Sequence, residues 1–167
     1  MGASAGAEDG VGLSDFIAKY HCKIVEQFEL IHERGTRANA KDRFVVLASQ
    51  DNPQKFAQCI LFDFDTNALC EVSSGRYGPA LADVQSLYLG PESLGVLKEL
   101  GFSEPEGQAN HSKELRMGLK PNFFELATLM LTVMYRVMGM RDGNVMLLTA
   151  PVAAKSRTLV TPCTPLS

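Results

Sequence analysis

The sequence has no surplus of basic residues. Among its 167 residues, 16 are Lys or Arg and 19 are Asp or Glu, which gives a formal net charge of −3. Proteins that hold a phosphate backbone depend on clustered positive charge. We therefore expect no nucleic-acid partner for this chain.

Long hydrophobic runs are also missing. The most apolar stretch, residues 125–136, is shorter than the roughly 20 apolar residues that a helix needs to cross a bilayer. The first residues, MGASAGAEDGVG, lack the basic region and apolar run of a signal peptide. Gly6 also stands where a myristoylation signal has Ser or Thr. These absences predict a cytoplasmic protein without a membrane partner.

No two of the four cysteines form a CxxC pair, which removes the basis for a zinc finger or a thioredoxin-like motif. The four are Cys22, Cys59, Cys70 and Cys163, of which Cys59 and Cys70 lie among strand-like apolar residues. We interpret the cysteines as buried free thiols in a reducing compartment. An alternative is an enzyme in which Cys59 or Cys70 is the nucleophile and His111 is the base.

Motifs of catalysis and metal binding are absent or incomplete. There is no GxGxxG after a predicted strand, no GKS or GKT, and no GxSxG. Asp63, Asp65 and Asn67 match the first three ligand positions of a calcium loop, but Ala68 and Ser74 replace its glycine and its bidentate Glu.

The histidines have no metal-binding spacing either. His21 and Cys22 are neighbours on a predicted helix, so their side chains are expected to point in different directions. No two histidines have the i, i+4 spacing of a helical metal site. We predict no catalytic residue, no metal and no cofactor.

The composition is that of one globular domain, with 46% apolar and 21% charged residues. We expect a disordered lead at residues 1–12, a single domain at 13–150 and a flexible Pro/Ser/Thr-rich tail at 151–167. Ser14 is a candidate N-cap for a first helix, and Gly35 is a candidate stop. The apolar stripe of that helix is Leu13, Ile17, Tyr20, Ile24, Phe28 and Ile31.

Three strands are predicted at residues 43–49, 56–64 and 68–74, joined by polar turns into an antiparallel meander. Their alternation places apolar residues on both faces: Phe44 and Val46 on one side, Val45 and Leu47 on the other. A sheet with one face in water alternates apolar and polar residues. We therefore expect something to cover part of the second face.

A short helix begins at Pro91 and ends at Gly101, where Phe102 can fold back onto Leu97. Residues 80–89 are either a short helix or an extended segment, residues 110–117 read as a strand, and residues 145–150 as a final strand.

The last helix, residues 123–138, is apolar over most of its circumference, with Asn122 and Glu125 in the pattern of a capping box. Its methionines are either core residues or part of a surface that accepts varied apolar partners.

This order of elements resembles the type III secretion chaperone-like family that includes the YbjN proteins and related peptide-binding chaperone domains. The similarity covers residues 13–140 and is carried by RFVVLAS, ALCEVSS, LKELGFSEPEGQAN and the apolar helix that follows. In such families a Leu-Gly-aromatic turn, then Pro and Asn, joins the second helix to the next strand. The matching residues here are Leu100, Gly101, Phe102, Pro105 and Asn110.

The resemblance implies an α+β domain, often a homodimer, that holds an extended segment of another protein. The apolar second face of the sheet independently favours a partner. We predict a non-catalytic protein-binding module, with itself or a protein or peptide client as partner. An alternative is a small-molecule sensor with an apolar pocket between the long helix and the sheet. The predicted partner or dimer surface is Val45, Leu47, Cys59, Leu61, Met130, Met134 and Met138.

Overall fold

The computed structural model describes residues 5–34, 42–75, 87–107, 109–150 and 158–164. The helices of these residues are α1 (Ala5–Glu33), α2 (Pro91–Glu99) and α3 (Phe123–Arg136). The strands are β1 (Phe44–Ser49), β2 (Phe56–Phe62), β3 (Asn67–Val72), β4 (His111–Arg116), β5 (Met146–Thr149) and β6 (Thr158–Leu159).

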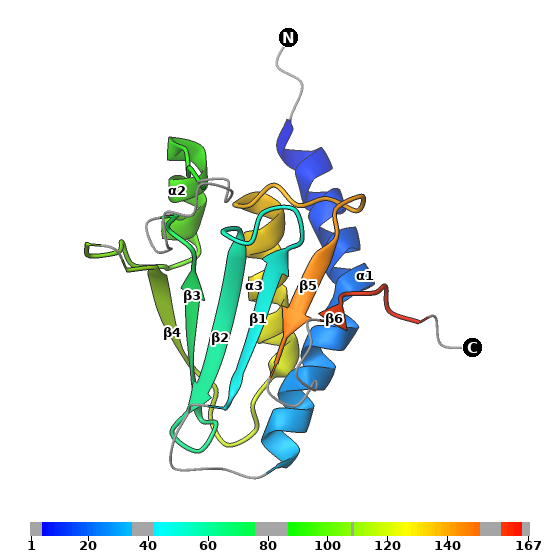
Figure 1. Ribbon diagram of the computed structural model, residues 1–167, viewed down its shortest axis with the longest axis vertical. Helices are drawn as coiled ribbons and strands as arrows, with labels where there is room; N and C mark the ends of the chain where they lie inside the picture. The colour runs from blue at the N-terminus through cyan, green and yellow to red at the C-terminus, as the bar shows by residue number, and fades with distance from the viewer. Residues whose placement is uncertain (1–4, 35–41, 76–86, 108, 151–157, 165–167) are drawn as a thin grey trace.

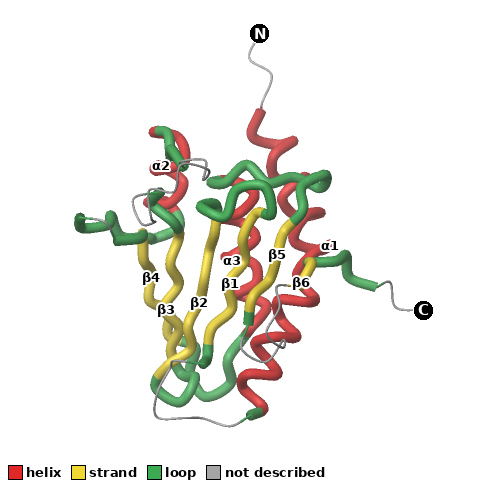
Figure 2. The backbone as a smooth tube through the Cα atoms, viewed as in Figure 1, coloured by secondary structure: helices red, strands yellow, loops and turns green. Residues whose placement is uncertain are grey.

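The described strands form one six-stranded sheet in the order β4-β3-β2-β1-β5-β6. Each neighbouring pair is antiparallel. Helices α1 and α3 lie side by side on one face of this sheet, and α2 lies at one end of it (Figure 1). The tube in Figure 2 shows the same two layers, helices behind and strands in front. The predicted α+β class is therefore confirmed.

The core lies between the two helices and the sheet. The strands alternate between half-buried and buried residues, as expected for a sheet covered on one face. Aromatic rings of α1 pack against aromatic rings of α3. The ring centroids of Phe16 and Tyr135, near the end of α3, are 5.3 Å apart, and those of Phe28 and Phe123, at its start, are 5.7 Å apart. These contacts hold α1 and α3 together over the length of α3.

The predictions of a three-stranded meander and of a long C-terminal helix are wrong, because the sheet of the described residues has six strands and α3 is neither long nor the last element. β4 pairs with β3 through Val72 and His111, and β5 pairs with β1 through Val46 and Thr149, so the sheet grows on both sides. α3 has 14 residues against 29 in α1, and two strands follow it. Pairing between distant segments depends on tertiary contacts, which the periodicity of one segment does not contain.

Both ends of the chain are more ordered than predicted. α1 begins at Ala5, so most of the expected disordered lead is helical and Ser14 is not its N-cap. The expected flexible tail contains β6, the buried Val160 and Cys163, whose backbone N–H donates to the Lys19 carbonyl over 2.7 Å.

The local signals around α2 and α3 are confirmed. Gly101 has φ +88°, a left-handed conformation that suits glycine, and Phe102 N–H donates to the Leu97 carbonyl over 3.0 Å. The Asn122 side chain accepts the N–H of Glu125 and caps α3. The strands predicted at residues 110–117 and 145–150 are β4 and β5. The segment at residues 80–89 lies mostly outside the described residues, and Gly35 also lies outside them.

Among the helices of the described residues, none combines the length and the apolar character that a bilayer crossing requires.

Candidate functional site on the open face of the sheet

The two faces of the sheet differ in what covers them. One face lies under α1 and α3, while no helix of the described residues lies over the other (Figure 1). We call the second one the outer face, and its apolar residues are all half-buried rather than buried. They are Phe44, Val46, Ala48, Phe56, Ile60, Phe62, Leu69 and Leu147.

The predicted partner surface is wrong, because its residues belong to the opposite face, to the inner side of α3 and, for Met138, to the buried residues just after α3. Each of them is at most 3% exposed and is part of the core of this chain. They are Val45, Leu47, Cys59, Leu61, Met130, Met134 and Met138. Alternation shows which residues share a face, but it does not show which face the helices cover when both are apolar.

The outer face has an apolar row across three central strands. Phe44, Ile60 and Leu69 are register partners on β1, β2 and β3. Cross-strand neighbours of this kind lie close enough for their side chains to touch. The row therefore presents a continuous apolar strip to whatever lies over the sheet.

A second apolar row begins at β5. Ala48 is the register partner of both Phe56 and Leu147, and these residues line a shallow hollow of about 210 Å³. Between the two rows, the Gln58 side chain donates to Glu71 over 2.5 Å. The outer face thus has two apolar rows in its centre, with the Gln58–Glu71 contact between them. Polar register partners, among them Thr149 and Glu114, lie toward its sides.

The edges of the sheet are less suited to binding than its face. On the β4 side, Ser103 N–H donates to the Ser112 carbonyl over 2.8 Å, and Glu114 and Arg116 are exposed on that strand. On the other side, β6 has two residues. Charged and very short edge strands discourage the addition of another strand.

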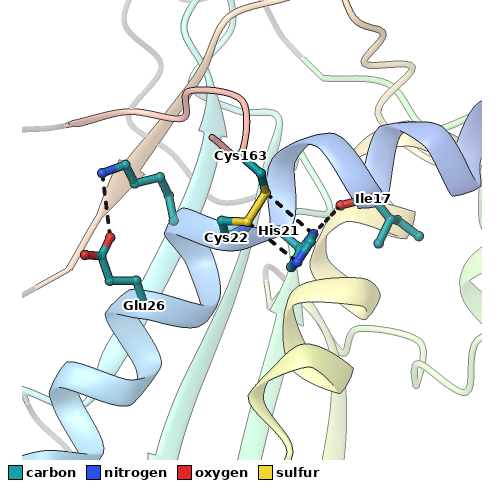
Figure 3. The surroundings of a disulfide bond; sticks show 6 residues. Ile17, His21, Cys22, Glu26 and Cys163 are labelled. Atoms are coloured by element: carbon teal, nitrogen blue, oxygen red, sulfur yellow. Dashed lines mark hydrogen bonds and ion pairs between the residues drawn. A yellow bond between two sulfur atoms is a disulfide. The ribbon is translucent and has the colours of Figure 1, made fainter. Parts of the chain in front are cut away.

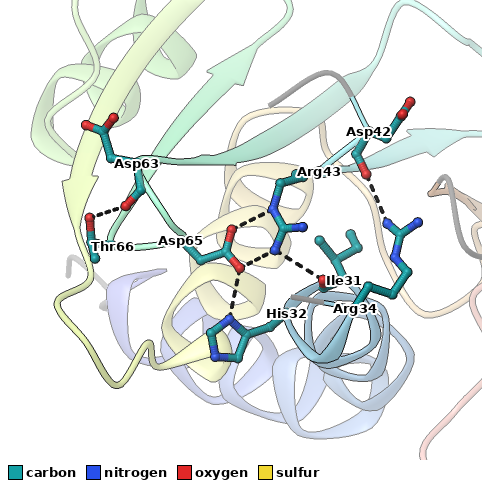
Figure 4. A network of polar contacts seen from close by, with 8 residues as sticks. All are labelled: Ile31, His32, Arg34, Asp42, Arg43, Asp63, Asp65 and Thr66. Carbon is teal, nitrogen blue, oxygen red and sulfur yellow. Dashed lines mark hydrogen bonds and ion pairs between the residues drawn. The ribbon is translucent and has the colours of Figure 1, made fainter. Parts of the chain in front are cut away.

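A buried ion pair supports the turn between β2 and β3 (Figure 4). Arg43 and Asp65 are 2% and 1% exposed, and Arg43 donates from Nε to Asp65 Oδ1 over 2.7 Å and from Nη2 to Oδ2. Arg43 Nη2 also donates to the Ile31 carbonyl over 3.1 Å. His32 Nδ1 is 2.9 Å from Asp65 Oδ2. The pair therefore ties the turn to both α1 and β1.

The backbone of this turn is unusual. Asp63, Phe64 and Asp65 have φ values of 49°, 56° and 60°, in the left-handed region that side chains other than glycine seldom adopt. Asp tolerates this conformation better than most residues, but Phe64 does not share that advantage. The pattern that resembles a calcium loop is thus a turn held by Arg43, a partner that the local sequence did not indicate.

All four cysteines are disulfide-bonded, so the prediction of free thiols is wrong. Cys59 bonds to Cys70, its register partner across β2 and β3, and both lie in the core. Cys22 bonds to Cys163, 141 residues later. Pairing could not be predicted from the sequence, because it depends on which segments the fold places together. A bonded sulfur is not a thiolate, so neither Cys59 nor Cys70 offers a nucleophile in this state.

The His21 side chain lies beside the second of these bonds, contrary to the expected divergence of His21 and Cys22 (Figure 3). His21 Nε2 is 3.6 Å from Cys22 Sγ, and His21 Nδ1 is 3.7 Å from Cys163 Sγ. The imidazole reaches this position because it bends back along α1 toward the Ile17 carbonyl, 2.9 Å from Nδ1.

A polar cluster links α1 to the turn before β5. Lys19 Nζ donates to Asp142 Oδ1 over 2.7 Å, and the Tyr20 hydroxyl donates to the same oxygen over 2.5 Å. The hydrogen bonds from Lys19 and then Tyr20 lower the pKa of Asp142 below its ordinary value. Burial and the bond to Asp142 raise the pKa of Tyr20.

Replacing Lys19 by Met is expected to raise the pKa of Asp142 toward its ordinary value, because the strongest donor to its carboxylate is lost. A carboxyl group whose pKa is lower in the folded state than in the unfolded state stabilises the fold when the pH is above the unfolded-state pKa. This contribution is lost as the pH falls through the folded-state pKa. Carboxyl NMR titration of Asp142 measures the shift. Lys23→Met is the control, since Lys23 pairs with Glu26 instead. Equal titration curves for the two variants would contradict the assignment.

The pocket expected between the long helix and the sheet is filled. Leu126, Met130 and Met134 on the inner side of α3 are each at most 1% exposed. A hollow of about 820 Å³ lies instead beside α2, where Leu94, Leu97 and Phe102 line it. The predicted position of a small-molecule pocket is therefore wrong.

Comparisons with protein-family models, with curated proteins and with solved structures found no match for this chain. The resemblance to secretion chaperones stays a prediction. The case for a function rests on the geometry of the site.

Proposed function

We propose that this chain is a non-catalytic protein-binding module that holds a partner polypeptide on the outer face of its sheet. The observation that carries the proposal is the apolar row of Phe44, Ile60 and Leu69 on a face that no helix of the described residues covers. Antiparallel sheets with one face in water normally carry polar residues there. Contiguous apolar surface of this kind is typical of interaction sites.

Covering the outer face would stabilise a complex through the hydrophobic effect, at about 25 cal/mol for each Å² of apolar surface removed from water. Phenylalanine side chains, here Phe44, Phe56 and Phe62, are enriched in the centres of protein interfaces. The exposed charges of Glu114 and Arg116 on β4 would form the polar rim.

The resemblance to secretion chaperones supports two kinds of occupant, a second copy of this chain or a client segment. A dimer through the outer faces would pack sheet on sheet, with the apolar rows of the two copies between them. A client would lie across the same rows. The cytoplasmic location stays a prediction from the sequence, whereas the two disulfide bonds are typical of oxidising compartments.

Replacing Ile60 by Lys is expected to weaken partner binding by about 30-fold or more, because a charge in the centre of an apolar contact costs at least about 2 kcal/mol. Leu119→Lys is the matched control, since Leu119 is an exposed leucine outside the sheet. Sedimentation equilibrium of the purified variants measures self-association. Proteins captured by wild type and by each variant are compared by quantitative mass spectrometry.

Two results support the proposal: a dimer that Ile60→Lys dissociates, or a client that Ile60→Lys loses, while Leu119→Lys behaves like wild type. The proposal is wrong if wild type is monomeric and Ile60→Lys captures the same proteins in the same amounts. A dimer that both variants form equally well would also contradict it. Circular dichroism checks that Ile60→Lys is folded.

A further inference from the structure

Three potential metal ligands meet on the helical side of the molecule. His21 and Cys22 belong to α1, and Cys163 belongs to the segment after β6 (Figure 3). Their ligand atoms all lie within 4.8 Å of one another, and no other such group occurs among the described residues. Cys22 is exposed and His21 and Cys163 are half-buried, so small solutes can reach the group from water.

The histidine has the orientation that a metal ligand requires. With its Nδ1 proton donated to the Ile17 carbonyl at 2.9 Å, the lone pair of Nε2 is left free. Metal-bound histidines commonly donate their other N–H in this way, which fixes the tautomer and the ring. The Phe124 ring packs edge-on against the imidazole, with centroids 5.0 Å apart, and limits its rotation further.

The spacing of the ligands also fits a metal ion. Nε2 of His21 is 3.6 Å from Sγ of Cys22. Two ligands of a tetrahedral zinc ion, at about 2.05 Å for nitrogen and 2.3 Å for sulfur, are about 3.6 Å apart. The Cα atoms of Cys22 and Cys163 are 5.4 Å apart, so side-chain rotation can separate the two sulfurs once they are unbonded.

We propose that His21, Cys22 and Cys163 bind a zinc ion when the Cys22–Cys163 disulfide is reduced, with water as the fourth ligand. A dithiol reductant donates two electrons and two protons: the Cys22–Cys163 bond breaks, two thiols form, and the reductant closes its own disulfide. The metal ion then displaces the two thiol protons, and its bonds to sulfur and to His21 replace the covalent link.

Backbone contacts prepare the site for thiolates. The Cys22 N–H lies 3.3 Å from Cys163 Sγ and points at it as a donor. Hydrogen bonds to the charged form of a group favour that form. The segment that carries Cys163 also contacts β5 through the Val160 N–H, which donates to the Met146 carbonyl over 2.9 Å.

The other cysteine pair offers no competing site. Cys59 and Cys70 are in the core, and the described residues place no histidine in a metal-binding group with them. Any zinc that the reduced chain binds with histidine and thiolate ligands is therefore bound by Cys22 and Cys163.

The test titrates zinc into the reduced full-length protein against a chromophoric chelator, and cobalt in parallel to record the absorption of thiolate-bound tetrahedral Co²⁺. Reduced wild type is expected to bind one ion with thiolate absorption, and the oxidised protein none. His21→Ala is expected to weaken binding by roughly tenfold or more. His32→Ala, a histidine change on the same helix, is expected to bind as wild type.

Binding of zinc by the oxidised protein would overturn the proposal, as would reduced wild type that binds no ion. Equal affinities of wild type and His21→Ala would also overturn it. Because the oxidised and reduced wild type need no substitution, the comparison stands even if a variant fails to fold. The site lies on α1, on the side of the sheet away from the outer face, so its failure leaves the proposed function untouched.

Discussion

Removing the Cys22–Cys163 disulfide by a Cys22→Ser/Cys163→Ser double substitution is expected to lower the free energy of unfolding by about 4–5 kcal/mol. The bond joins residues 141 positions apart, so it closes nearly the whole chain into a loop. In the chain-entropy account, a longer loop restricts the unfolded state more strongly. Urea unfolding of the oxidised wild type and of the variant, both with a metal chelator, measures the difference.

The structure also predicts which segment loses the most local stability when the disulfide is removed. Apart from the disulfide, the described part of the segment after residue 157 is held by the pairing of β6 with β5, by Val160 and by the Cys163 N–H, which donates to the Lys19 carbonyl. Without the disulfide, these contacts alone hold the segment. Amide hydrogen exchange in β6 and at Val160 is expected to accelerate more than exchange in β2.

Thr164→Ser, a conservative change of an exposed neighbour in the same segment, is the control and is expected to unfold like wild type. A double variant with an unchanged urea midpoint would show that the bond contributes little to stability. Equal exchange rates in β6 with and without the bond would show that it does not hold the end of the chain.

Replacing Asp65 by Asn is expected to destabilise the fold by about 3–5 kcal/mol, because it leaves the Arg43 guanidinium buried without a counter-charge. The two charged groups are almost completely shielded from water, and Asp65 also accepts a contact from His32. Asn keeps the size of the side chain and tolerates a φ of 60°. The loss is therefore one of charge, and thermal and urea unfolding measure it.

Asp63→Asn is the matched control. Asp63 lies in the same turn with a φ of 49° but is exposed, and its side chain accepts a hydrogen bond from Asn67 that an amide oxygen can also accept. The expected change is within about 0.5 kcal/mol. If Asp63→Asn and Asp65→Asn are equally destabilising, the turn backbone rather than the buried charge pair determines the effect.

A combined Arg43→Met/Asp65→Asn variant tests whether the two side chains contribute to the free energy of unfolding as a pair. Removing both charges avoids the unpaired buried guanidinium that Asp65→Asn alone leaves behind. The double variant is expected to be more stable than Asp65→Asn alone. Additive losses would indicate that the two side chains do not act as a pair.

The sequence was informative wherever a structural feature depends on neighbouring residues. The end of α2 at Gly101, the cap of α3 at Asn122 and the positions of β4 and β5 all follow from local conformational preference and periodicity. The alternation in β1 also grouped Phe44 with Val46, which are residues of the outer face.

The sequence placed the candidate site on the face of the sheet that the helices cover, for a physical reason. Val45 and Phe44 are both apolar, so the pattern of the strand is the same whichever of its faces is buried. The choice was made by α1 and α3, whose aromatic contacts place them together over the face that contains Val45 and Leu47. No property of β1 alone distinguishes the two outcomes.

The sequence by itself determined the α+β class, most of the elements and the sets of residues that share a face, since these depend on interactions over a few positions. The tertiary structure alone decided which face is open, that Arg43 meets Asp65, and that Cys22 meets Cys163. Those contacts join segments far apart along the chain, and they form only when the packing of the whole core brings the segments together.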